Sequence, residues 1–279
     1  MPRGNIPRQP ARTGRQDRIA RALTPAKRVP KKSRGNQSAP VGKAVLGRPG
    51  SATAVSASKR KKQTAYNPLA PERIAEILKR LDQLYPDVTC ALTHTSAWEL
   101  LVATILSAQS TDVNVNRVTP ELFRKYPTVE AFAALTPEQL EPDVRSTGFF
   151  RNKSKSVVGA AKKIVADFGG QVPHNMNDLL TLPGVARKTA NVVLGTAFGI
   201  ASGIVVDTHV QRLAGRLDLT RNTDAKKIEQ DLIKIIPKDK WILFAHQLIW
   251  HGRRVCQARK PRCMECNLER ICYSQDKTI

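Results

Sequence analysis

Four cysteines near the C-terminus constrain the fold of this 279-residue chain more than any other feature of its sequence. Gaps of six, two and five residues separate Cys256, Cys263, Cys266 and Cys272. Loops this short can wrap four thiolates around one centre, either a tetrahedral zinc ion or a [4Fe-4S] cluster. Zinc sites commonly combine two tight cysteine pairs, whereas only one pair is tight here, so the spacing favours the cluster. The fifth cysteine, Cys90, stands alone and is expected to be a small buried hydrophobe.

The positive charge of the chain is concentrated at its N-terminal end. Residues 1–68 contain 17 Lys and Arg but only one acidic residue, which accounts for +16 of the total formal charge of +23. This segment has no hydrophobic periodicity, so we predict that it is disordered. A DNA-tethering tail is the favoured interpretation, because nucleic acid is the commonest polyanionic partner. An inert extension and a targeting segment are the alternatives.

Neither export nor membrane insertion is predicted. No stretch approaches the ~18 apolar residues of a membrane helix, and the N-terminus lacks the apolar segment of a signal peptide. We therefore expect a cytoplasmic, nucleoid-associated protein without membrane contact, while organellar or nuclear targeting by the basic tail stays open. Cysteines crowded together in such a protein are better explained as metal ligands than as disulfides.

From residue 71 onward the sequence predicts short helices rather than paired strands. Proline or capping patterns indicate where helices start, and proline or glycine indicates where they end. The predicted starts are Pro71, Ser96, Thr136, Thr223–Asp224 and Trp241, and the predicted ends include Pro237 and a stop near Gly252. Together these signals predict an all-α fold of about ten short helices.

The stretch Leu182–Ala190 is the most informative part of the chain. Pro183–Gly184 forces a tight turn between two helical segments. Backbone N–H groups are left free at the start of the second segment, which makes the turn a phosphate-binding site that reads no base sequence. On its own, a Pro-Gly turn would suit a plain helix-loop-helix corner equally well.

Several motifs in the same order resemble the endonuclease III family of helix-hairpin-helix DNA glycosylases. Leu182–Ala190 closely resembles the hairpin of that family, and Val206–His209 resembles the acidic motif that follows it. The cysteine spacing matches the family's [4Fe-4S] ligands, and Leu106–Gln109 is similar to its first helix-loop signature. The resemblance extends from about residue 71 to residue 272.

The resemblance implies a two-lobed, all-α helix-hairpin-helix DNA glycosylase fold with a cleft between the lobes. A six-helix lobe with the hairpin would comprise residues 90–200, and an iron-sulfur cluster lobe would combine residues 69–89 with 201–279. The implied function is a base-excision-repair bifunctional DNA glycosylase/AP lyase that removes oxidised pyrimidines. Its partner would be double-stranded DNA with a damaged pyrimidine or an abasic site, and we expect a monomer.

The resemblance also implies that Lys188 is the nucleophile and Asp207 its acidic partner. Breaking the C1′–N bond creates positive charge on the sugar, which a carboxylate stabilises, and an amine can attack C1′ to form a Schiff base. A lysine attacks only as the free amine, a form that Arg187 and the positive end of the helix favour and a nearby carboxylate opposes. The alternatives are a phosphate-binding cation at Lys188 and a helix N-cap at Asp207.

Base extrusion from a duplex requires side chains that fill the gap. By resemblance, Gln109 is the polar plug, and the loop with Gly148 and Phe149 supplies the wedge. His209 is either a DNA contact or a structural histidine. The basic loop between the first two clustered cysteines is interpreted as a phosphate-binding segment, although a solvated loop is the alternative. The remaining expected DNA contacts are Leu182, Gly184, Val185, Ala186, Arg187, Arg259, Lys260 and Arg262.

Several positions depart from the family pattern or are ambiguous. Thr147 and Phe149 replace medium-sized aliphatic residues around the wedge glycine, and Phe150 is expected in the core. Ala186 replaces a glycine, which predicts a weaker hairpin contact. Asp112 resembles an acidic pocket residue but is equally consistent with a helix N-terminal residue.

Two other functions fit parts of the pattern. One is a monofunctional mismatch glycosylase of the adenine type, and the other is a non-catalytic iron-sulfur protein that binds damaged DNA. The first typically lacks the hairpin lysine, so Lys188 argues against it. The presence of both Lys188 and Asp207 argues against the second.

Overall fold

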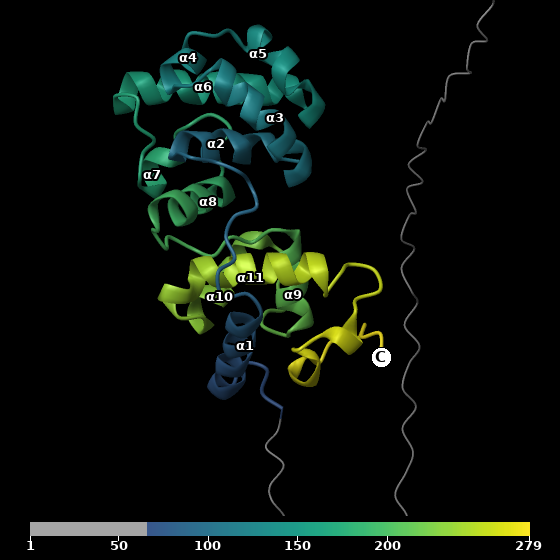
Figure 1. Cartoon of the computed structure of the whole chain (residues 1–279). Helices are drawn as coiled ribbons and strands as arrows, with labels where there is room; N and C mark the ends of the chain where they lie inside the picture. Colours follow the sequence, from purple (N-terminus) through teal and green to yellow (C-terminus); the bar gives the residue numbers. More distant parts are fainter. Residues whose placement is uncertain (1–65) are drawn as a thin grey trace, which may run out of the picture. The chain divides into compact units, whose positions relative to one another are not determined.

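The computed structural model describes residues 66–279 (Figure 1). Residues 1–65 of the tail predicted for residues 1–68 therefore lie outside the described residues. Its last three residues, Tyr66–Pro68, lie within the described part. The Tyr66 ring packs against Tyr273 with centroids 4.3 Å apart, and its hydroxyl donates to Asp218 Oδ2 at 3.2 Å. These contacts tie the start of the described segment to the C-terminal part of the chain.

Residues 66–279 are all-helical, as predicted, with eleven α-helices, four short 3-10 helices and no strand. Residues 203–206, with the sequence Gly-Ile-Val-Val, are part of an irregular connection. No helix of this described part has the length and apolar character needed to cross a membrane. The α-helices are α1 Pro71–Leu84, α2 Ala97–Leu106, α3 Asp112–Lys125, α4 Val129–Ala133, α5 Pro137–Val144, α6 Phe150–Phe168, α7 Met176–Leu179, α8 Arg187–Phe198, α9 Thr208–Arg216, α10 Ala225–Ile235 and α11 Trp241–Arg254. The 3-10 helices are η1 Arg145–Thr147, η2 Lys238–Lys240, η3 Cys263–Glu265 and η4 Glu269–Ile271.

The first of two hydrophobic cores is built by α2–α8 (Figure 1). Helix α2 is apolar along most of its length, and Leu100, Leu101 and Leu106 on it are completely buried. Helix α6 packs against α4 and α5, and α8 packs against α2. A helix that is apolar on all sides must be surrounded by other elements, and this explains the central place of α2.

The second core is built by α1, α9, α10 and α11. Helix α11 packs against both α1 and α9, and α9 packs against α10. Helix α1 precedes the first core in the sequence, yet Figure 1 shows it on the side of α9–α11. Its apolar stripe of Ile74, Ile77, Leu78 and Leu81 is buried there. The described part of the chain, residues 66–279, therefore begins and ends on the side of the second core and forms the first core in between.

Most predicted helix starts are accounted for by side-chain caps. The capping box at the start of α5 is complete, because Thr136 accepts from the Gln139 N–H and Gln139 accepts from the Thr136 N–H. At the start of α2, Ser96 accepts from the Glu99 N–H as predicted. The Glu99 carboxylate accepts instead from the Thr95 N–H, at 2.6 Å.

Helix α11 ends near Gly252, as the sequence predicts, although Gly252 itself lies inside the helix. The helix continues to Arg254, and Gly252 is buried within it. A Cβ at this position would lie 2.9 Å from His209 Nδ1 and 3.0 Å from Arg212 Nη2. Glycine is needed here because α9 approaches closely, not because the helix terminates.

We predict that Leu101→Ala lowers the free energy of unfolding by ~2–5 kcal/mol, since it opens a cavity at a completely buried site. Val113→Ala on α3 is the matched control, because Val113 is 71% exposed and should change stability by less than ~0.5 kcal/mol. Urea denaturation of both variants measures the difference. Equal midpoints would contradict the central role of α2 in the first core.

Candidate active site and DNA-binding surface

A cavity between the two cores brings together the residues that the sequence assigns to catalysis. Lys188 from the first turn of α8 and Asp207 from the residue before α9 both line it. Asp112, the first residue of α3, lines the same cavity and forms an ion pair with Arg253 of α11. Asp112 therefore fits both interpretations, because it is a helix N-terminal residue and an acidic residue that lines the cavity.

Asp207 is the N-cap of α9. Its Oδ1 accepts from the N–H groups of His209 and Val210, both at 2.8 Å. Its Oδ2 has no hydrogen-bond partner among residues 66–279. The capping bonds therefore fix the side chain while one carboxylate oxygen stays available for a substrate. The N-cap alternative for Asp207 is compatible with a chemical role.

The hairpin turn depends on one glycine. Gly184 has φ +76°, and a Cβ there would lie 2.5 Å from Ser156 Cβ. The N–H groups of Gly184 and Ala186 have no acceptor within the described part of the chain, so both can bind a phosphate. Ala186 has φ −94°, which any L-residue adopts, so its methyl group does not strain the turn. The weaker hairpin contact expected at Ala186 stays a prediction.

Leu182 and Val185 are buried at the hairpin. Both side chains belong to the first core. The Val185 N–H donates to the Leu182 carbonyl oxygen, so that N–H is already satisfied. Both side chains anchor the hairpin, and a DNA contact of either residue stays a prediction.

Arg187 is engaged in an ion pair that the sequence did not predict. Its Nε and Nη2 donate to the two carboxylate oxygens of Glu229 on α10, at 2.9 and 3.1 Å. Glu229 is buried and also accepts from Asn191 Nδ2 at 3.0 Å. Because Glu229 largely balances the charge of Arg187, this arginine is neither a free phosphate-binding cation nor a source of positive charge for Lys188. It joins the two cores.

The expected plug and wedge both occupy exposed loops. Gln109 follows α2 with φ +55°, and Phe149 precedes α6 with φ +49° and is 63% exposed. Gly148, between η1 and Phe149, has φ +72°. Thr147 is buried instead, and its hydroxyl donates to the Val144 carbonyl. Phe150 packs against the first core, as predicted.

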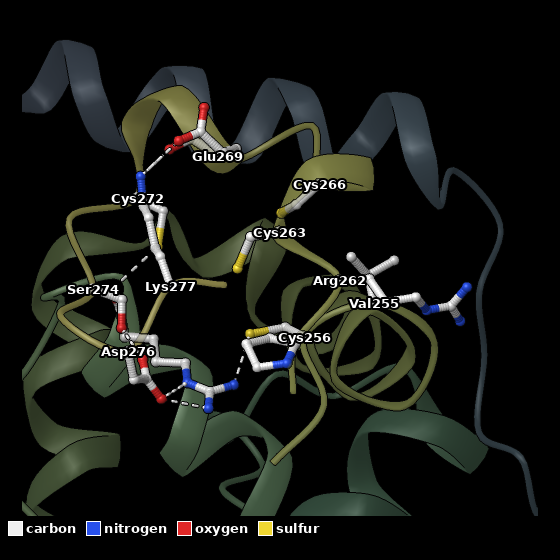
Figure 2. Close-up of a pocket in the computed structure, with 12 residues that line it drawn as sticks. Val255, Cys256, Arg262, Cys263, Cys266, Glu269, Cys272, Ser274, Asp276 and Lys277 are labelled. Atoms are coloured by element: carbon white, nitrogen blue, oxygen red, sulfur yellow. Dashed lines mark hydrogen bonds and ion pairs between the residues drawn. The ribbon is translucent and has the colours of Figure 1, made fainter. Parts of the chain in front are cut away.

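The four clustered cysteines surround a small pocket after α11 (Figure 2). Arg216 Nη1 donates to Cys256 Sγ at 3.3 Å, and the Thr278 N–H donates to Cys263 Sγ at 3.5 Å. Burial raises the pKa of the Cys266 thiol to about 11, so a cationic centre is needed to hold it as a thiolate. Among the described residues, no three His, Cys, Asp or Glu side chains are grouped as ligands of a metal ion.

The basic residues of the loop between Cys256 and Cys263 differ in whether their side chains are already bonded. Arg262 donates to the Arg254 carbonyl and forms an ion pair with Glu265, so it stabilises the loop itself. Arg259 and Lys260 are exposed, and Lys260 has φ +52°. Of the three expected phosphate contacts, Arg259 and Lys260 are available, whereas Arg262 is already occupied.

Comparisons with known proteins identify the family. Residues 102–238 match the HhH-GPD superfamily of base excision DNA repair proteins. The endonuclease III of Synechocystis is 56% identical over 203 residues, which cover 73% of this chain and 93% of the relative. That of Bacillus subtilis is 43% identical over 207 residues, covering 74% and 94%.

The chain belongs to the endonuclease III family. Among solved structures, a trapped endonuclease III–DNA covalent intermediate matches with a TM-score of 0.70 and 41% identity, covering 73% of this chain and 96% of that chain. The helix-hairpin-helix fold predicted from the sequence is thereby confirmed. The protein is a base-excision DNA repair enzyme of the glycosylase/AP lyase class, and its partner is DNA.

One face of α11 contributes cavity residues that the sequence analysis missed. His246, Ile249, Trp250 and Arg253 all line the cavity. Burial lowers the pKa of His246, although Asp207 acts in the opposite direction, so the ring is neutral at neutral pH. The spacing of these four residues follows one helical face, which is the signal that could have identified them. His209, by contrast, packs against Gly252 and bonds Arg212 at 3.1 Å, as a structural histidine does.

We predict that Asp207→Asn separates the capping role from the chemical role. Asn caps helices as well as Asp, so stability should change by only a few tenths of a kcal/mol. Loss of the negative charge should slow single-turnover base excision by roughly 10²–10³-fold. Asp224→Asn, at the N-cap of α10, is the matched control. An Asp207→Asn enzyme that excises at the normal rate would leave Asp207 with only its capping role.

Proposed function

We propose that this enzyme removes oxidised pyrimidines from duplex DNA and cuts the strand through a Schiff base on Lys188. The observation that carries the proposal is the shared cavity. It is lined by the Lys188 amine and the Asp207 carboxylate, which come from different cores, and it adjoins the hairpin whose free N–H groups suit a phosphate. An exposed amine next to a fixed carboxylate is what a bifunctional glycosylase requires.

The chemistry follows from these two groups. As the C1′–N bond breaks, its electron pair leaves with the base, and Asp207 stabilises the positive charge that develops on the sugar. The Lys188 amine forms a bond to C1′ and loses one proton. The C1′–O4′ bond then breaks, O4′ keeps the electron pair and takes up a proton, and the nitrogen lone pair forms the iminium as the sugar ring opens. The iminium acidifies the C2′ proton, and its removal expels the 3′ phosphate by β-elimination. Water then hydrolyses the imine and returns Lys188 to the free amine.

The exposed loops supply the base-extrusion step. Gln109 and Phe149 extend from neighbouring loops, so each can enter the duplex where the damaged base leaves the stack. The N–H groups at Gly184 and Ala186 fix the backbone of the damaged strand. Arg259 and Lys260 add phosphate contacts on the other core. None of these residues reads a base, so the enzyme would bind duplexes of any sequence.

The four clustered cysteines would hold a [4Fe-4S] cluster. Their sulfurs face one pocket, and Arg216 and the Thr278 N–H donate hydrogen bonds of the kind that stabilise thiolate ligands. When bound, the cluster would supply covalent cross-links that stiffen a segment otherwise held by short 3-10 helices. The residues around it would then present Arg259 and Lys260 to DNA.

The two hydrophobic cores would act as the two lobes that grip a bent duplex. The first core would be the hairpin lobe of residues 90–200, and the second would be the cluster lobe of residues 69–89 and 201–279. A single asymmetric lesion needs one active site, so a monomer is proposed. The relatives are bacterial, which supports action on a cytoplasmic, nucleoid-associated chromosome.

We predict that borohydride traps a covalent adduct between this enzyme and a duplex with one thymine glycol. Lys188→Gln should abolish the adduct and slow single-turnover cleavage by on the order of 10³-fold or more. Lys226→Gln, an exposed lysine of α10, is the control and should trap normally. Retained DNA binding without any adduct in the wild-type enzyme would favour a monofunctional glycosylase or a non-catalytic damage binder.

A second prediction concerns the cysteines. Purified enzyme should have the visible absorption of an iron-sulfur protein, and Cys263→Ser should lose it together with tight DNA binding. Cys90→Ser is the matched control, because Cys90 packs against the first core, away from the other four. A colourless wild-type protein with one equivalent of zinc would replace the cluster by a zinc site.

A further inference from the structure

Two of the four non-glycine residues with positive φ in the described chain are Gln109 and Phe149. A left-handed conformation is strained for a residue with a Cβ, and it persists only where surrounding contacts enforce it. These two are also the side chains assigned to enter the duplex. Something must therefore hold both loops in a conformation that neither would keep alone.

The contact that does so is a buried lysine. Lys153, in the first turn of α6, is only 5% exposed. Its ammonium donates to the Leu106 carbonyl at 2.8 Å and to the Thr147 carbonyl at 2.7 Å. Leu106 is the last residue of α2, directly before the Gln109 loop, and Thr147 is the last residue of η1, directly before Gly148 and Phe149.

The bonds of Lys153 are unusual for such a buried cation. Both acceptors are neutral carbonyls, and no carboxylate lies within ion-pair distance among residues 66–279. Burial without a counter-charge lowers the pKa of this lysine. An aliphatic side chain would avoid the cost of burying an unpaired charge. The N–H donors of Lys153 must therefore do something that an aliphatic side chain cannot. They satisfy the carbonyl groups at the ends of α2 and η1, which have no partners within their helices.

A second, more exposed bridge joins the same two loops. Asn114 Nδ2 donates to Ser110 Oγ at 3.1 Å and to the Ser146 carbonyl at 2.9 Å. Lys153 also lines a groove whose walls include Gln109, Phe149 and Gly184 of the hairpin. The brace therefore lies beneath the surface where the plug, the wedge and the phosphate-binding turn meet.

We propose that Lys153 is a positioning residue for base extrusion, whose ammonium braces the Gln109 loop against the Phe149 loop so that the two side chains enter the duplex together. This inference rests on the proposed glycosylase/AP lyase function. Lys153 does not touch the reacting sugar, and it lines a different hollow from Lys188 and Asp207. Its loss should therefore impair extrusion and leave the Schiff-base chemistry intact.

The test compares two substrates that differ in their need for extrusion. One is a duplex with a single thymine glycol, in which the base must leave the stack. The other is a single-stranded oligonucleotide with a preformed abasic site, which Lys188 can attack without a wedge. Lys153→Met keeps the length of the side chain and removes the ammonium. Single-turnover excision from the duplex should fall by roughly ten- to a hundredfold, while borohydride trapping on the single strand should stay within about twofold of wild type.

Three further variants separate positioning from general damage to the fold. Gln109→Ala should give the same substrate pattern, and adding it to Lys153→Met should cost less than the product of the two single effects. Asn114→Ala, which removes the exposed bridge, should shift the ratio of the two activities in the same direction by a smaller factor. Lys162→Gln, an exposed lysine further along α6, should leave both activities unchanged.

Each result decides the matter. Normal duplex excision by Lys153→Met would overturn the proposal, and so would an equal loss on both substrates, which would indicate a merely structural role. If Lys153→Met fails to fold, the Asn114→Ala ratio decides, and an unchanged ratio overturns the proposal. Wild-type enzyme that traps on neither substrate would instead reject the function on which the inference rests.

Discussion

The Glu229 carboxylate joins the two cores through buried hydrogen bonds at the start of α8. It receives two hydrogen bonds from Arg187 and one from Asn191, and Asn191 in turn accepts from Ser202. A buried charge with one partner would be costly, but a carboxylate with three donors is well compensated. Gly203 permits this arrangement, since a Cβ there would lie 2.0 Å from Glu229 Oε1.

The relative placement of Lys188 and Asp207 depends on these hydrogen bonds. Arg187 directly precedes Lys188, so the ion pair fixes the start of α8 against α10. Helix α10 packs on α9, and Asp207 caps the first turn of α9. Lys188 and Asp207 are thus connected through a continuous series of bonded and packed elements, although they belong to different cores. A change at Glu229 would therefore alter the geometry of the cavity without touching the substrate.

Local physics in the sequence was enough to predict the helices and the hairpin. Pro71, the Thr136 box and the Gly184 turn each act over four residues or fewer, and each is present as expected. The partners of Arg187 and Lys153 were not predictable. Glu229 is 42 positions from Arg187, and Leu106 is 47 positions from Lys153. Such pairs are brought together by packing of the cores, and nothing in the local pattern distinguishes them from exposed cations.

Gly252 has a second role that the local pattern does not predict. A glycine near the end of an apolar helix usually marks its C-terminus, and α11 does end two residues beyond Gly252. The structure uses it for the close approach of α9, a requirement set by His209 and Arg212.

The electrostatics of the cavity follow from where its helices begin. Asp112 is the first residue of α3, Lys188 is the second of α8, and Asp207 caps α9. Three helix N-termini therefore border one cavity, and each presents partial positive charge from its free N–H groups. That field stabilises the two carboxylates, the DNA backbone and the negative charge that leaves with the base.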